Sequence, residues 1–247
     1  MTPTLEVHPA AAWADAVAAA LTDRLRAWPR LRLCLPTGET PVSLYAALSA
    51  SADAGLWSQA TVVLLDDYVG LSADDPAAGG PRLRREIVDH VRPAVFIEID
   101  QSGDLAAAAR RHDEAARGLD LAIVGLGLNG HIGFNEPGST ADSATRVVDL
   151  HPRSREAAEG YGTEGAPERG ITIGLARLLD ARELWLLVTG VPKAEILRAA
   201  LEGPETPDVP ASYLRRHPSW RVMADDAAAS LLGRADRWMT HRGDTVS

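Results

Sequence analysis

The sequence predicts an α/β fold in which helices cover both faces of a mostly parallel sheet. Six short segments read as near-continuous apolar runs, which are typical of strands buried on both faces. Amphipathic helical patterns lie between these runs. Because strands and helices alternate along the chain, right-handed crossovers between parallel strands are expected.

The expected elements follow one another in a regular order. The strands are LRLCLP (31–36), TVVLLDD (61–67), AVFIEI (94–99), DLAIVGLG (120–127), ELWLLVTG (183–190) and WRVMAD (220–225). The helices are residues 9–27, 41–50, 82–91, 103–117, 192–201 and 226–232. The stretch 152–170 is polar and glycine-rich without an apolar period, so either a flexible lid or a plain surface insertion is expected there.

This organisation indicates one domain, residues 1–233, followed by a charged tail, residues 234–247, that we expect to fray. Of the 247 residues, 46% are hydrophobic and 24% are charged, which suits a sizeable buried core. The formal net charge of −9 argues against a nucleic-acid-binding protein, which normally carries a basic face. A few local Arg or Lys residues would still suffice to bind a phosphorylated substrate.

Cysteine usage and hydropathy indicate a cytoplasmic protein. The single cysteine, Cys34, excludes an internal disulfide and suits a reducing compartment. Since it lies in the apolar run LRLCLP, we expect it to be buried as packing. The sequence shows neither a basic-then-apolar leader nor an apolar run long enough for a bilayer, so no membrane association is expected.

Polar and glycine-rich segments follow several of the expected strands. They are PTGETP after the first strand, DDYVGL after the second, NGHIGFNEPGS after the fourth and TGVPKAE after the fifth. In doubly wound sheets, ligands bind beyond the carboxyl ends of the strands. One site built from several loops is therefore expected at this edge of the sheet.

The stretch GLGLNG, residues 125–130, matches the G-x-G-x-x-G pattern of dinucleotide-binding proteins. In those proteins the loop runs directly into a helix whose N-terminus meets the pyrophosphate. Here HIGFNEPGS follows, and its two glycines and proline make a poor helix start. We therefore interpret GLGLNG as a tight turn and expect no nucleotide cofactor.

The informative part of this segment is a histidine five residues before a glutamate. A carboxylate bonded to one imidazole nitrogen fixes the tautomer and leaves the other nitrogen free for proton transfer. His131 and Glu136, with Asn129 two residues before the histidine, are therefore candidate catalytic residues. A structural histidine that bonds only to backbone is the alternative.

Two adjacent carboxylates, Asp66 and Asp67, come at the end of a buried strand. If strand geometry persists, their side chains point in opposite directions, so only one of them enters a cleft at this edge. A carboxylate at the mouth of an apolar cleft can have a raised pKa and act as a general base. A turn cap, which aspartate also favours, is the alternative.

PTGETP opens the helical pattern 41–50, with Thr40 as the expected N-cap. Backbone N–H groups at such a turn form an anion site, to which Thr37, Gly38 and Thr40 are suited. Glu39 is not, because a carboxylate about 5 Å from a phosphate charge costs on the order of 3 kcal/mol at an effective dielectric of 20. Glu39 should therefore point away or meet another part of the ligand; a plain strand-to-helix turn is the alternative.

Two basic residues lie on the same ligand-side loops. Arg146 follows the histidine loop, and Lys193 opens the helix after the fifth strand. Both are candidates for neutralising a phosphate at this edge. For each of them a solvated surface position is the alternative.

Taken in order, five stretches resemble the glucosamine-6-phosphate deaminase family, within a wider group that includes 6-phosphogluconolactonases. They are LPTGETP, LDDYVGLSADDP, GLGLNGHIGFNEPGS, ITIGLARLLDARELWLLVTGVPKAE and VPASYLRRHP, and they extend from about residue 31 to residue 230. NGHIGFNEPGS is the most specific, because the lactonases share its Gly-His but resemble the deaminases less in FNEP.

The resemblance implies a single Rossmann-like domain that converts an amino-sugar phosphate into a ketose phosphate and ammonia, with neither cofactor nor metal, and that is classed as a hydrolase. It implies that His131 assists ring opening, oriented by Glu136 and supported by Asn129, while Asp66 moves a proton between C2 and C1. The residues implied to hold the ligand are Thr37, Gly38, Glu39, Thr40, Asp67, Ser139, Arg146 and Lys193, with Arg146 and Lys193 at its phosphate.

Several ligand-contacting positions depart from the family pattern. Glu39 stands where Gly or Ser is usual, Asp67 replaces a more usual Glu, and Asn129 stands where Asp is common. AAGGP (77–81) replaces a polar-aromatic pair. Gly160 lies near the position of a phosphate-binding arginine of the lid. These departures leave the reaction type better defined than the substrate.

Three alternatives stay open from the sequence: a lactonase or isomerase acting on a related phosphosugar, a homologue with an altered substrate, and a sugar-phosphate sensor. The sensor is disfavoured, because repressors of that type carry an N-terminal helix-turn-helix and only one expected helix precedes the first strand. The oligomeric state is also open, and a homo-oligomer is one of its outcomes.

Overall fold

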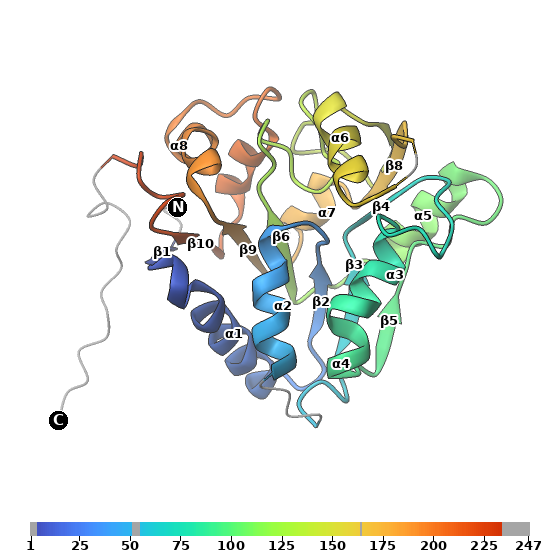
Figure 1. The fold of residues 1–247 in the computed structure, drawn as a ribbon, viewed down its shortest axis with the longest axis horizontal. Coiled ribbons are helices and arrows are strands. Elements are labelled where there is room, and N and C mark those ends of the chain that lie inside the picture. The colour runs from blue at the N-terminus through green and yellow to red at the C-terminus, as the bar shows by residue number, and fades with distance from the viewer. Residues whose placement is uncertain (1–3, 51–54, 164, 234–247) are drawn as a thin grey trace.

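The computed structural model describes residues 4–50, 55–163 and 165–233 (Figure 1). Its main sheet has seven strands in the order β1-β10-β9-β6-β2-β3-β5, and all neighbours pair in parallel. The strands are β1 Thr4–His8, β2 Arg32–Leu35, β3 Thr61–Leu64, β5 Val95–Ile97, β6 Leu121–Gly125, β9 Glu183–Val188 and β10 Trp220–Asp225. A three-stranded antiparallel sheet combines β4 Asp66–Tyr68, β8 Arg169–Thr172 and β7 Arg146–Asp149, in that order.

Helices fill the connections between these strands. They are α1 Ala10–Ala27, α2 Thr40–Ala50, α3 Gly79–Leu83, α4 Asp89–Val91, α5 Leu105–Ala115, α6 Pro152–Gly160, α7 Leu175–Leu179 and α8 Ala194–Glu202. A π-helical turn, η1 Arg84–Val88, joins α3 to α4, and the 3-10 turns η2 Val191–Lys193 and η3 Pro210–Arg216 flank α8. Within the described ranges, no helix combines the length and the apolar character that crossing a membrane requires.

Successive side chains of the central strands enter different hydrophobic cores. In β2, Leu33 and Leu35 belong to the cluster that contains α1 and α2, which Figure 1 shows in front of the sheet. Cys34 between them belongs to the cluster that contains α7 and α8. This alternation confirms the predicted α/β fold with helices on both faces, and Cys34 is fully buried as expected.

The expected strand 61–67 is divided between the two sheets. β3 ends at Leu64, and the chain then leaves the main sheet. Asp66 starts β4 and pairs with Thr172 of β8 in the antiparallel sheet. The division matters for the site because it places Asp66 where the two sheets meet, at the carboxyl edge of the main one.

Three other expectations require correction. Residues 226–231 form successive turns instead of a helix; the Asp225 carboxylate accepts from Ala228 N at 2.6 Å, and Asp225 O accepts from Ala229 N at 3.0 Å. The edge strand TLEVH (4–8), which includes Glu6, was not expected. The polar stretch 152–170 contains α6 and the start of β8, so it is not irregular throughout, and the choice between a lid and a surface insertion stays a prediction. The expected tail, 234–247, lies outside the described residues.

Candidate active site

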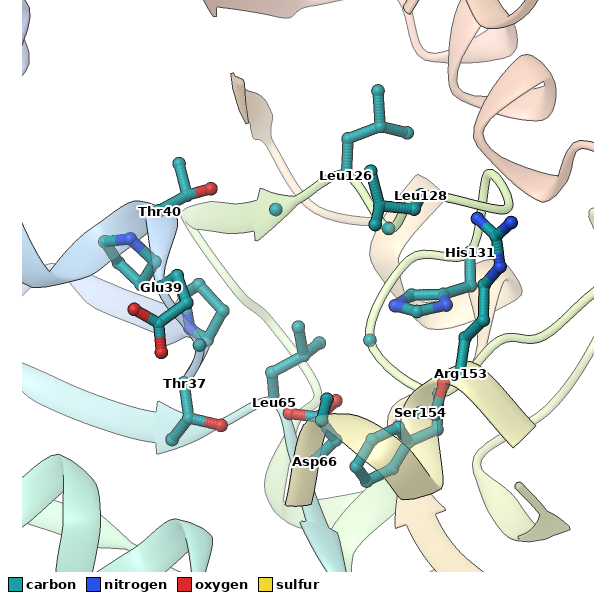
Figure 2. Close-up of a pocket in the computed structure, with 18 of the residues that line it drawn as sticks. Thr37, Glu39, Thr40, Leu65, Asp66, Leu126, Leu128, His131, Arg153 and Ser154 are labelled. Carbon is teal, nitrogen blue, oxygen red and sulfur yellow. The ribbon is translucent and has the colours of Figure 1, made fainter. Parts of the chain in front are cut away.

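A cavity of about 430 Å³ opens at the carboxyl edge of the main sheet. Its walls are segments that follow β2, β3, β6 and β9, together with residues of α6. In Figure 2, Glu39 and Thr40 lie on one side of the cavity, His131 and Arg153 lie on the other, and Asp66 lies between them. The predicted convergence of several strand-end loops on one site is confirmed.

His131 and Glu136 form the central pair of the cavity. His131 Nδ1 lies 3.2 Å from Glu136 Oε2. Asn129 Nδ2 donates to the same carboxylate oxygen at 3.2 Å, and Asn129 Oδ1 accepts from the backbone N–H of His131. Because Nδ1 faces a carboxylate, the proton is assigned to Nδ1, and Nε2 is the nitrogen available to a ligand.

The glycines of GLGLNG have local roles in this loop. A Cβ at Gly127 would lie 2.3 Å from Nε2 of His131, so the imidazole requires glycine beneath it. Gly130 adopts a φ of 85°, and Gly130 N donates to Gly127 O to close a tight turn. No helix follows in residues 126–136. The interpretation of this stretch as a tight turn is confirmed.

Glu136 is held as a carboxylate by its neighbours. Burial on its own would raise the pKa of Glu136, but hydrogen bonding and charge from His131, with hydrogen bonds from Ser154 and Asn129, lower it to about 2. Ser154 Oγ donates to Glu136 Oε1 at 2.5 Å. Since the carboxylate keeps its negative charge at neutral pH, it can orient His131 and stabilise the protonated imidazole.

Asp66 lines the cavity and is 7% exposed. Burial raises the pKa of Asp66 to about 8, with further contributions from the nearby charges of Asp67 and Glu136. A carboxyl group with such a pKa exchanges a proton readily near neutral pH, which is what a general base requires. The structure therefore brings Asp66 and His131 into the same cavity, whereas Glu136 and Asn129 support His131 from outside the lining residues.

Asp67 points away from Asp66, as the strand geometry predicts. Asp67 Oδ1 accepts from Gly79 N at 2.6 Å, and Oδ2 accepts from Gly80 N at 3.3 Å. A Cβ at Gly79 would lie 2.8 Å from the backbone oxygen of Asp66, so this contact requires glycine and accounts for part of AAGGP. Asp67 does not line the cavity. In this structure Asp67 has a structural role at the start of α3, and its expected substrate contact stays a prediction.

The loop after β2 contributes Thr37, Gly38, Glu39 and Thr40 to the cavity wall, as expected. Gly38 has a φ of 115°, which favours glycine. Thr40 is the first residue of α2, so the expected N-cap position is one residue late and falls on Glu39. The Glu39 side chain is 81% exposed, and its Oε1 lies 3.8 Å from Arg82 Nη2.

Lys193 lies in the cavity wall beyond β9. Its Nζ donates to Leu126 O at 2.5 Å. Burial lowers the pKa of Lys193 to about 8, because desolvation disfavours the charged ammonium. The lysine is thus positioned to meet an anion in the cavity.

Arg146 and Ser139 do not line the cavity. Arg146 Nη2 donates to Ser139 Oγ at 2.7 Å, and Nη1 donates to Asn135 Oδ1 at 2.9 Å. Asn135 in turn bonds to the backbone oxygens of Ile132 and Ile173. In this structure both residues brace the outer side of the histidine loop, and their expected ligand contacts stay predictions.

Residues of the cavity that sequence reasoning missed come mainly from α6 and its end. Arg153, Ser154 and Tyr161 line the cavity, and so does Tyr68 of β4. The sequence signal for α6 was Pro152, which occupies the first turn of the helix. The side chain of the preceding His151 accepts a hydrogen bond from Arg153 N and so caps this turn. Within the described ranges, no three His, Cys, Asp or Glu side chains are grouped as metal ligands would be.

Sequence relatives of the chain share one name. A family model described as glucosamine-6-phosphate isomerases/6-phosphogluconolactonase matches residues 6–223. The chain is 40% identical over 228 residues to a Rhodopirellula baltica protein named glucosamine-6-phosphate deaminase, which covers 88% of this chain and 91% of that relative. A protein of the same name from Streptomyces avermitilis is 38% identical over 241 residues, which covers 93% of this chain and 92% of the relative.

Solved structures agree with these relatives. A structure described as a monomeric glucosamine-6-phosphate deaminase has a TM-score of 0.86 and 31% identity, and covers 92% of this chain and 99% of its own. A 6-phosphogluconolactonase from Leishmania guyanensis has a TM-score of 0.75, 20% identity, and coverage of 92% and 98%, which shows the fold alone. The deaminase names support an enzyme but not the expected hydrolase label. The homo-oligomer stays a prediction.

Proposed function

Because the chain belongs to the family of glucosamine-6-phosphate isomerases and 6-phosphogluconolactonases, we propose that it is a glucosamine-6-phosphate deaminase. The reaction converts glucosamine 6-phosphate and water into fructose 6-phosphate and ammonia. The observation that carries the proposal is that Asp66 and His131 line one cavity, with the Glu136 carboxylate 3.2 Å from His131 Nδ1. The relatives with 38–40% identity favour this reaction over lactone hydrolysis.

Ring opening is the task of His131. A pyranose opens when the proton of its C1 hydroxyl leaves and a proton arrives at the ring oxygen. The free Nε2 of His131 accepts the first proton and returns one to the ring oxygen. Glu136 stabilises the imidazolium that exists between these two transfers, since its carboxylate lies 3.2 Å from Nδ1.

Asp66 carries the proton of the isomerisation. In the open-chain aldehyde, the ionised carboxylate takes the proton from C2, the C2 ammonium gives up one proton, and O1 gains that proton, so that a neutral enolamine forms. Asp66 then returns its proton to C1, which leaves an iminium cation at C2. Water adds to this carbon, and ammonia and a proton leave, so the atoms and charges balance. The substrate's C2 ammonium favours the ionised form of Asp66, which offsets the effect of burial on its pKa.

The phosphate fits the part of the cavity formed by the loop after β2. Backbone N–H groups at the start of α2 and the hydroxyls of Thr37 and Thr40 are donors for an anion there, and Lys193 supplies a positive charge. Arg153 is a second cation on the cavity wall, next to His131 (Figure 2).

The test is product analysis with purified protein and glucosamine 6-phosphate. The proposal predicts fructose 6-phosphate and ammonia in equal amounts, and no hydrolysis of 6-phosphogluconolactone above the uncatalysed rate. Absence of both products at high enzyme concentration would overturn the substrate assignment. An Asp208→Asn variant, changed at an exposed position, is the control for an Asp66→Asn variant that should lose turnover.

A further inference from the structure

A buried arginine lies behind the loop after β2, outside every motif that the sequence suggested. Arg82 of α3 is 5% exposed. Its Nε donates to Glu86 Oε1 at 2.7 Å, and its Nη2 donates to Gly38 O at 3.2 Å. The same Nη2 lies 3.8 Å from Glu39 Oε1. Arg82 thus connects α3 directly to the backbone of the cavity loop.

A further partner of Arg82 is Tyr161, which follows the last residue of α6 and lines the cavity. Arg82 Cζ lies 3.8 Å from the centroid of the Tyr161 ring, a cation–π distance. This contact holds the ring of Tyr161 against α3. The phenol hydroxyl of Tyr161 can donate a hydrogen bond to an acceptor.

The Tyr161 hydroxyl lies close to the loop that is suited to an anion. A Cβ on Gly38 would be 3.9 Å from Tyr161 Oη, so the hydroxyl faces the space that a side chain at position 38 would enter. Tyr161 therefore presents a neutral hydrogen-bond donor to this loop from the end of α6.

The charges around Arg82 decide which of the two residues touches the ligand. Arg82 already faces two carboxylates, those of Glu39 and Glu86. The positive charge of Arg82 offsets the repulsion that Glu39 would exert on a phosphate. Because Arg82 faces both Glu39 and Glu86, these three side chains together carry no net positive charge. Arg82 itself does not line the cavity, whereas Tyr161 does.

We propose that Tyr161 is a substrate-binding residue whose hydroxyl donates a hydrogen bond to the anionic group held at the Thr37–Thr40 loop, and that Arg82 is the positioning residue that holds the Tyr161 ring. The inference rests on the proposed function, because the anionic group is taken to be a sugar phosphate. It assigns part of the substrate affinity to the Tyr161 hydroxyl and to the arginine that positions its ring.

The experiment compares Tyr161→Phe and Arg82→Met with the wild type, and uses Tyr213→Phe as the matched control, since Tyr213 lies outside the cavity. Binding of inorganic phosphate and of glucosamine 6-phosphate is measured by calorimetry, and turnover is measured separately. Tyr161→Phe should raise both dissociation constants about tenfold and raise KM more than it lowers kcat. Arg82→Met should have the same effect in the wild type and almost none in the Tyr161→Phe background.

Unchanged phosphate binding in Tyr161→Phe, or a wild type that binds neither phosphate nor the sugar phosphate, would overturn the inference. Equal losses from Arg82→Met with and without the Tyr161 hydroxyl would remove Arg82 as its positioning residue. Thermal denaturation of each variant reports any loss of folding, and Tyr161→Phe alone is sufficient for the test if Arg82→Met does not fold. If Tyr161→Phe weakens phosphate binding but no variant releases ammonia, the binding role stands and the proposed function fails.

Discussion

Replacing Asp66 by asparagine should stabilise the protein and abolish its activity. Folding raises the pKa of Asp66 from its ordinary value of 3.8 to about 8, because burial disfavours the charged carboxylate. Between these values the native state retains a proton that the unfolded chain has released, so the free energy of unfolding falls as pH rises. Over this interval the free energy of unfolding falls by about 1.4 kcal/mol per pH unit. At pH 7 the ionisable Asp66 therefore lowers the free energy of unfolding by at most about 4 kcal/mol. Asparagine has nearly the same shape as aspartate but does not ionise, so the Asp66→Asn variant avoids this loss of stability.

Urea denaturation at several pH values measures the effect. The stability advantage of Asp66→Asn over the wild type should grow between pH 5 and pH 7 and become constant above about pH 8, while the exposed Asp208→Asn control shows no such trend. A difference that stays constant from pH 5 to pH 9 would refute the reasoning, because it would mean that Asp66 has a similar pKa in the folded and unfolded states. Retained turnover would remove Asp66 as the base.

Three further outcomes are expected. Glu136→Gln should lower kcat by about 10² to 10³-fold with little change in KM, because His131 loses the carboxylate that orients it. Steady-state kinetics measure both constants. A change confined to KM would contradict this role of Glu136. The profile of kcat/KM against pH should be a narrow bell near pH 8, since it rises as Asp66 loses its proton and falls as Lys193 loses its own. Lys193→Arg should remove the alkaline fall, and a wild-type profile that is flat from pH 6 to pH 9 would oppose both assignments. Gly127→Ala should cost at least about 10²-fold in kcat by displacing the imidazole, whereas Gly160→Ala, which lies outside the cavity lining and has nothing within 4 Å of the added carbon, should be near wild type. Equal activities of the two variants would show that His131 does not need its position over Gly127.

The parts of the fold that the sequence predicts are those in which burial leaves a local pattern. Strands β2, β6, β9 and β10 are buried on both faces, so each is an apolar run that needs no knowledge of its partners. α6 has no such pattern. Only Ser154 and Ala158 are buried in it, and a serine and an alanine do not form an apolar stripe that would predict a helix.

The same distinction applies to the site. His131, Glu136 and Asn129 are close in sequence, so their chemistry is visible as a motif. Arg82 and Tyr161 are far apart along the chain, and both depend on where α3 and α6 pack.

The direction in which a side chain points was the second property that the sequence could not predict. Asp67 and Arg146 are chemically suited to bind a ligand, but the backbone N–H groups of Gly79 and Gly80 and the Asn135 amide take up their side chains. The residue types alone do not contain this information.

Isotope tracing with glucosamine 6-phosphate deuterated at C2 tests the central claim most directly, namely that Asp66 moves a proton from C2 to C1 before ammonia leaves. The account predicts slower turnover of the deuterated substrate and a ketose phosphate that carries part of the deuterium at C1, the rest having exchanged with water. An aldose phosphate that keeps its deuterium at C2 would contradict the account, because ammonia would then have been displaced without isomerisation.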